Sequence, residues 1–258
     1  MNYFKLPTAF FGAAILLCAV GAQSNIVLAQ DHVIIQPRTV VLAPARKETP
    51  RHPTRGKATA RYPIVLGLNN PSVLRRVQQK LAVKNVFGST IEEYRRDEGF
   101  EDLDYKVNYN KSYLLDITFQ HSGMGAYPST ERKHFLINLK SGISIKATDA
   151  FKAESLAILA AMANQKLKAE TKELLRVVAD DKEQNAEQKA SLKEQLEQLT
   201  FTVENLNEFS VSDKGVTFLF DAGFPHVIQA LQPDGEYFFT YAELRTHMEP
   251  NGPLGIFK

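Results

Sequence analysis

Two segments of alternating polarity, joined by a glycine-containing bend, constrain the fold of this chain more than any other feature. In residues 113–120 apolar side chains alternate with polar ones, a period of two that places the apolar side chains on one face of a β-strand. Residues 133–138 predict a second strand. Between them, Gly123 and Gly125 tolerate positive φ, and Pro128 fixes its own φ and lacks an N–H donor. We therefore predict a hairpin whose bend, residues 123–129, is an irregular loop with exposed backbone amides.

The first 29 residues have the pattern of a secretory signal peptide. A short, positively charged start precedes an apolar run over residues 6–20, and small-residue cleavage patterns end at Ala22 and Ala29. The run is about 15 residues long, shorter than the ~20 residues that span a bilayer. We expect cleavage, a periplasmic or secreted protein, and no transmembrane span afterwards. The single cysteine, Cys18, lies in this segment, so the mature chain would form neither disulfides nor thiolate metal sites.

Residues 30–61 are predicted to be a linker, followed by one folded domain over residues 62–258. The linker is rich in proline and basic residues and poor in large apolar ones, which is typical of an extended, mobile segment. It could tether the protein to an anionic wall polymer or to lipid headgroups, or serve as a solvated spacer, and we favour the spacer. The formal net charge of the whole chain is only +2, which does not indicate a nucleic-acid partner.

Helix signals flank the predicted hairpin on both sides. Asn70 before Pro71 predicts a helix start, and this helix is expected to end at Gly88. Ser89 and Glu92 have the capping-box spacing of a second, short helix. Apolar residues at helical spacing between residues 148 and 199 predict two helices, arranged as a helical hairpin.

Further strand signals complete an α+β pattern. Alternation over residues 103–109 and a short apolar segment at residues 143–147 predict strands on either side of the hairpin, with a turn at Asn110 and Lys111. A second hairpin is expected over residues 208–220. A strand at residues 236–239 then leads to the capping box Thr240–Glu243 of a terminal helix. We predict an α+β domain with a mostly antiparallel sheet and helices packed on one face.

A series of short motifs resembles the RsiV-like family of extracytoplasmic domains. The motifs occur in the family's order and are Tyr62-Pro63, the bend over residues 123–128, residues 135–142, and the segment from Phe209 to Pro225-His226. This family is found in lysozyme-sensing anti-sigma factors and beside the catalytic domain of PdaC-type peptidoglycan deacetylases. The chain has Tyr127 where the family usually has histidine. Few residues precede the apolar run, and the chain ends soon after the last predicted helix, so we expect a domain that acts alone.

Two functions from different classes follow. The first is a non-catalytic domain of the cell envelope that binds wall glycan, peptide or a protein partner. Its predicted ligand-binding residues are Gly123, Gly125, Tyr127, Pro128, Ser129, Phe224 and His226. The second is a small cell-wall hydrolase with His121 or His226 as the base.

The sequence contains no metalloprotease His-Glu-x-x-His motif and no Gly-x-Ser-x-Gly nucleophile elbow. His121 and His134 flank the bend and could approach each other across the hairpin, with Glu131 as a metal ligand or base. In strands such residues are more often solvent-facing. We therefore assign no catalytic residue, metal ligand or cofactor.

Overall fold

The structure, a computed structural model, describes residues 31–42, 58–97, 99–125, 128–180 and 185–257. The predicted signal peptide and its cleavage sites lie outside these residues, as do residues 43–57 of the predicted linker.

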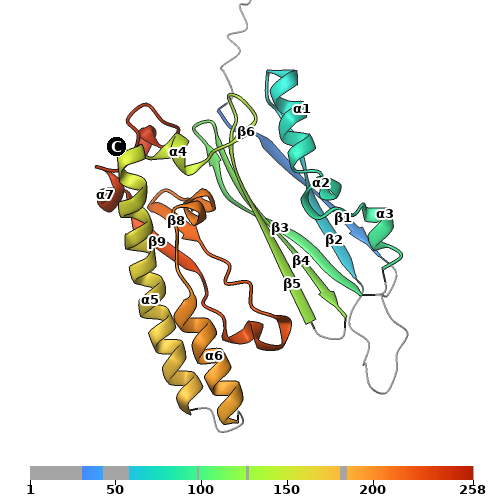
Figure 1. Ribbon diagram of the computed structural model, residues 1–258. Helices are drawn as coiled ribbons and strands as arrows, with labels where there is room; N and C mark the ends of the chain where they lie inside the picture. The colour runs from blue at the N-terminus through green and yellow to red at the C-terminus, as the bar shows by residue number, and fades with distance from the viewer. Residues whose placement is uncertain (1–30, 43–57, 98, 126–127, 181–184, 258) are drawn as a thin grey trace, which may run out of the picture.

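The predicted mostly antiparallel sheet is present, and it is the larger, six-stranded one of two sheets. Its strands follow the chain order from one edge to the other, and only β2 and β3 run parallel (Figure 1). They are β1 (Ile34–Val41), β2 (Thr59–Leu66), β3 (Phe100–Lys111), β4 (Leu114–Met124), β5 (Pro128–Asn138) and β6 (Ile143–Ser144).

Three helices between β2 and β3 cover one face of this sheet (Figure 1). They are α1 (Pro71–Lys80), α2 (Val83–Phe87) and α3 (Ile91–Tyr94). A parallel strand pair requires such a crossover connection. The Asn70 side chain accepts hydrogen bonds from the N–H groups of Ser72 and Val73, so the predicted helix start is confirmed. Buried residues of α1 then pack against Ile117 and Phe119 of β4.

Two details of these helices differ from the prediction. Helix α1 ends at Lys80, and a separate helix, α2, follows. Gly88, at φ +81°, therefore ends α2 rather than α1. The capping box of α3 is formed by Thr90 and Glu93, one residue later than predicted.

The second half of the chain forms a smaller unit around a three-stranded sheet. Its helices are α4 (Ala147–Ala150), α5 (Leu156–Asp180), α6 (Ala186–Gln198) and α7 (Tyr241–Leu244), and its strands are β7 (Phe209–Val211), β8 (Gly215–Leu219) and β9 (Glu236–Thr240). Short 3-10 turns lie at Ala153–Ser155, Glu204–Asn207, His226–Leu231 and Gly255–Phe257. The helical hairpin, the late β-hairpin and the capping box of Thr240 with Glu243 are confirmed. The late strands form a sheet of their own.

One apolar core joins the two units. It contains Phe151, Leu159 and Phe218 of the smaller unit together with Leu114 and Leu136 from the large sheet. These two residues point away from α1–α3, because Leu115 and Ile137, their neighbours in sequence, belong to the core beneath those helices. The large sheet therefore buries both faces at this end.

The predicted boundary between linker and domain at residue 62 is wrong. Strand β1 lies inside the predicted linker and pairs with β2 along its whole length, from Ile34 opposite Leu66 to Val41 opposite Thr59. Val33 and Leu42, which flank β1, are each only 2% exposed. An edge strand exposed to water tolerates proline and basic side chains, so its composition resembles that of a linker.

The turn between β3 and β4 lies two residues later than predicted. Ser112 and Tyr113 both have positive φ, at 55° and 61°, and Tyr113 belongs to the turn rather than to the strand. Asp31 supports this conformation, since its carboxylate accepts from Ser112 N–H at 2.9 Å and its carbonyl from Tyr113 N–H at 2.6 Å. The beginning of the described chain thus stabilises the central hairpin.

Candidate functional site

The predicted binding bend is shorter than the sequence indicated. Strands β4 and β5 stay in regular register up to the pair Met124–Pro128, so Gly123 and Ser129 are paired strand residues. Ser129 Oγ donates to the Gly123 carbonyl at 3.3 Å. Of the remaining bend residues, Gly125 is exposed, and residues 126 and 127 lie outside the described part of the chain. The predicted contact residue Tyr127 is among these two.

Gly123 serves close backbone packing rather than an unusual φ. A Cβ atom at this position would lie 3.2 Å from the Gly99 carbonyl oxygen, which also accepts a 2.6 Å hydrogen bond from Met124 N–H. The segment before β3 is therefore held against the end of β4. Gly125 and Pro128 remain exposed at the end of this stiff ladder.

His121 lies on the helix-covered side of the sheet in an aromatic enclosure. Its ring centroid is 5.1 Å from that of Tyr94 and 5.5 Å from those of Phe87 and Phe100. Its Nε2 atom is buried and has no hydrogen-bond partner within the described residues. Burial lowers the pKa of His121, and the carboxylates of Glu131, Asp97 and Asp102 oppose that shift.

His134 lies on the opposite face, next to Asp116. Its Nε2 atom is 2.9 Å from Asp116 Oδ1, which also accepts from Asn108 Nδ2 at 2.7 Å. Asp116 Oδ2 accepts from the backbone N–H of Val211 at 2.6 Å. The Asp116 side chain is fully buried and that of His134 is 7% exposed. This polar cluster joins β7 of the smaller sheet to the face of the large sheet.

The two histidines considered together at the sequence level do not meet. In the β4–β5 ladder His134 lies opposite Thr118, and His121 lies opposite Glu131. Thr118 and His121 are three residues apart on β4, so the two pairs point their side chains to opposite faces of the sheet. The cluster around Asp116 is not evident from local sequence patterns. Strand β7, which covers Asp116, lies 95 residues later in the chain.

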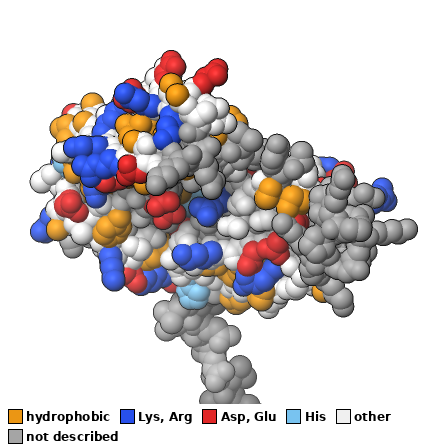
Figure 2. Space-filling model, turned by 90° about the horizontal axis from the view of Figure 1, so that it is seen from below, with side chains coloured by type: hydrophobic (Ala, Val, Ile, Leu, Met, Phe, Trp, Pro, Cys, Tyr) orange, Lys and Arg blue, Asp and Glu red, His pale blue; other side chains and the backbone are white. Residues whose placement is uncertain are grey.

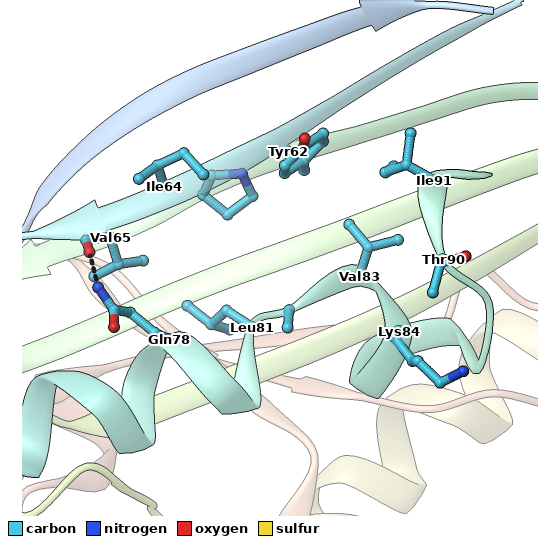
Figure 3. A pocket seen from close by; sticks show the side chains of 11 residues that line it. Tyr62, Ile64, Val65, Gln78, Leu81, Val83, Lys84, Thr90 and Ile91 are labelled. Atoms are coloured by element: carbon cyan, nitrogen blue, oxygen red, sulfur yellow. Dashed lines mark hydrogen bonds between the residues drawn. The ribbon is translucent and has the colours of Figure 1, made fainter. Parts of the chain in front are cut away.

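A largely apolar groove lies between β2 and the three helices that cover the sheet. It has a volume of about 380 Å³, within the size range of small-ligand pockets. Tyr62, Ile64, Leu81, Val83 and Ile91 line its walls (Figure 3). The Gln78 amide donates to the Val65 carbonyl at 2.8 Å and so is already engaged. The motif Tyr62-Pro63, singled out in the sequence, contributes to this wall.

One residue of the second predicted contact segment, Phe224, is buried in the core. Phe224 is 8% exposed and packs with Val178, Leu192 and Leu196 beneath the helical hairpin. Its burial identifies Phe224 as a core residue rather than a contact residue. Pro225 is exposed, and His226 begins the 3-10 turn His226–Leu231, but the side chain of His226 is outside the description.

Several general features of the described chain bear on ligand classes. No group of three His, Cys, Asp or Glu side chains within the described ranges is arranged to hold a metal ion. None of the helices in those ranges is long and apolar enough to cross a membrane. Figure 2 shows basic and acidic side chains interspersed over the face seen from below, unlike the one-sided basic surface typical of nucleic-acid-binding proteins.

Comparison with solved structures identifies the architecture. A member of the DUF3298 family from Bacteroides fragilis NCTC 9343 is similar with a TM-score of 0.55 at 12% identity, over 89% of this chain and 99% of that one. The chain has the fold of DUF3298 proteins. A DUF3298 family protein from Pseudomonas aeruginosa PAO1 is similar with a TM-score of 0.51 at 14% identity, over 86% of this chain and 95% of that one. The chain matches no protein-family model and no curated protein.

Proposed function

We propose that the protein is an exported, non-catalytic binding domain of the cell envelope that recognises wall polymer or an envelope protein through the end of the β4–β5 hairpin. The observation that carries this proposal is the regular ladder up to Met124 and Pro128. It presents Gly125 and Pro128, both exposed, on two strands that the rest of the sheet holds in place. A loop on a rigid scaffold is a common form of binding surface.

The signal-peptide pattern and the motif series support an extracytoplasmic role. The motifs resemble RsiV-like domains, and the fold shared with DUF3298 proteins covers nearly the whole chain. We accordingly propose kinship with RsiV-like domains and a periplasmic or secreted location.

The surroundings of His121 favour binding over hydrolysis. A general base must reach the proton that it removes, but the His121 ring lies among three aromatic rings with its Nε2 atom buried. The alternative hydrolase with His226 as base stays a prediction, because the side chain of His226 is not described.

An affinity experiment with matched aromatic variants tests the proposal. The purified protein is immobilised and exposed to an envelope extract of its native host and to isolated peptidoglycan. We expect Tyr127→Ala to weaken retention of the partner about tenfold, or ~1–2 kcal/mol, as loss of an aromatic anchor commonly does. Phe238→Ala, an exposed aromatic position on β9, serves as the control and should retain the partner.

Two results would contradict the proposal. One is equal retention by the wild type and both variants. The other is peptidoglycan hydrolysis by the purified protein that His121→Ala abolishes with the fold intact by circular dichroism, in which case the hydrolase hypothesis replaces the binding one.

A further inference from the structure

The outer edge of β5 is open along most of its length. β6 pairs only with Ile137 and Asn138, while β5 begins nine residues earlier at Pro128 and is paired there with β4 on its inner side alone. Thr130, Glu131, Arg132 and Lys133 are exposed. The edge is therefore a strand with one row of backbone groups turned away from its sheet.

The register identifies which backbone groups face outward. Ile145 N–H of the chain beyond β6 bonds to the Leu136 carbonyl at 2.9 Å, so the backbone groups of Leu136 point to the outer side. Backbone direction alternates along a strand, and the ladder with β4 is regular, so Thr130, Arg132 and His134 also turn their N–H and C=O groups outward. Within the described residues no hydrogen bond to these three N–H groups is found. The first and last of these N–H groups lie about 14 Å apart, because an antiparallel strand rises ~3.4 Å per residue.

The charges beside this edge are unequal on its two faces. Glu131 and Lys133 form a 2.9 Å ion pair on the face that carries the helices. Arg132, on the opposite face, has no acidic partner among the described side chains, and its neighbour across the ladder is Gln120. The open edge therefore combines outward amides and carbonyls with one unpaired positive charge.

A second copy of this chain is a poor occupant. A two-fold antiparallel pairing of two β5 edges must be centred on one residue of each strand. Centres at positions 131 and 133 place Glu131 or Lys133 opposite its own copy, and like charges directly opposite are destabilising. A centre at position 132 also sets Glu131 opposite Lys133 of the other strand, but these two side chains already pair within each strand, so the exchange adds little while Arg132 still faces its own copy. Centres further out shorten the overlap, since β6 covers one end and Pro128 lacks a donor at the other.

We propose that the outer edge of β5, from Thr130 to His134, binds an extended segment of a different protein as an added strand, with an acidic side chain of that segment against Arg132. Backbone hydrogen bonding of this kind recognises polypeptide, with neighbouring side chains setting the preference. The inference rests on the proposed binding function and narrows its partner to protein rather than glycan.

The test uses linear dodecapeptides selected from a random phage-displayed library on the purified protein, with amide hydrogen exchange measured by NMR. In the free protein the amides of Thr130, Arg132 and His134 should exchange quickly. A selected acidic peptide should slow them at least tenfold and leave those of Glu131 and Lys133, which face β4, unchanged. Arg132→Glu should lower the affinity for the peptide at least tenfold. Lys106→Glu, an exposed cation on the same face of β3, is the matched control and should bind within twofold of wild type.

The inference is overturned if no selected peptide protects these three amides, or if Arg132→Glu binds as well as the control. Its failure is distinguishable from failure of the proposed function. Envelope-partner binding lost in Tyr127→Ala but kept in Arg132→Glu would leave the proposed function standing and reject the edge. Binding that neither substitution weakens would reject both.

Discussion

Replacing Asp116 with alanine should destabilise the protein far more than removing an exposed carboxylate. Asp116 is fully buried: its Oδ1 atom accepts from Asn108 Nδ2 and lies 2.9 Å from His134 Nε2, and its Oδ2 atom accepts from Val211 N–H. Alanine leaves the Val211 N–H buried without an acceptor and removes the bonds of the other two groups.

The magnitude follows from these lost partners. A buried polar group left without a partner costs about 1–3 kcal/mol, and breaking a buried, hydrogen-bonded charge cluster costs about 3–5 kcal/mol. Asn108 keeps a second bond, 2.9 Å to Thr118 Oγ1, so its share of the loss is smaller. We expect Asp116→Ala to lower the free energy of unfolding by about 3–5 kcal/mol. Asp104→Ala, which breaks the exposed ion pair with Arg61, should cost less than about 1 kcal/mol.

Urea denaturation at neutral pH measures the free energy of unfolding of both variants. Hydrogen exchange of the Val211 amide reports whether β7 is loosened locally. If the cluster holds β7 on the sheet, the Val211 amide loses protection in Asp116→Ala while amides in α1 keep theirs under native conditions. The double variant Asp116→Ala/His134→Ala should lose less stability than the sum of the single variants, because the two side chains share one interaction. A loss for Asp116→Ala no larger than that for Asp104→Ala would refute this reasoning.

Two further predictions concern acid sensitivity and backbone conformation. Because burial lowers the pKa of His121, the neutral ring is favoured in the folded state; its stabilising contribution is full above the unfolded-state pKa of about 6.5 and is lost as the pH falls toward the folded-state pKa. The urea midpoint should therefore fall more steeply between pH 7 and pH 5 in the wild type than in His121→Gln, and parallel profiles would contradict this. Gly235, at φ +70°, has no room for a Cβ atom beside the Phe220 carbonyl, so Gly235→Ala should cost at least about 2 kcal/mol. Gly223→Ala is the control, at φ +65° with nothing within 4 Å, and should cost about 1–2 kcal/mol in thermal or urea unfolding; equal losses would show that the contact with Phe220 is unimportant.

Local signals predicted much of the α+β architecture because the interactions that form them lie within a few residues. Asn70 caps the helix that begins at Pro71, and Thr240 forms its capping box with Glu243. The alternation along residues 113–120 correctly separated Ile117 and Phe119, which lie in the core under the helices, from the opposite face. Capping hydrogen bonds and apolar periodicity join residues only a few positions apart, so a short stretch of sequence is enough to recognise them.

The extent of the candidate site could be predicted only in part. Gly125 and Pro128 are exposed as expected, but Gly123, Pro128 and Ser129 belong to the ladder, and Phe224 belongs to the core. Glycine is compatible with a loop, a close backbone contact or a positive φ, so its presence alone does not distinguish them.

The sequence by itself determined the helices, the hairpins and the faces of the central strands, whereas the tertiary structure decided what covers those faces and edges. A proline-containing, basic segment became β1 because β2 supplies its hydrogen-bond partners. The polar residue Asp116 is buried because the N–H of Val211, from far along the chain, donates to its carboxylate. The physical reason is the same in both cases: the burial of a polar group depends on a partner that is distant in sequence and adjacent only after folding.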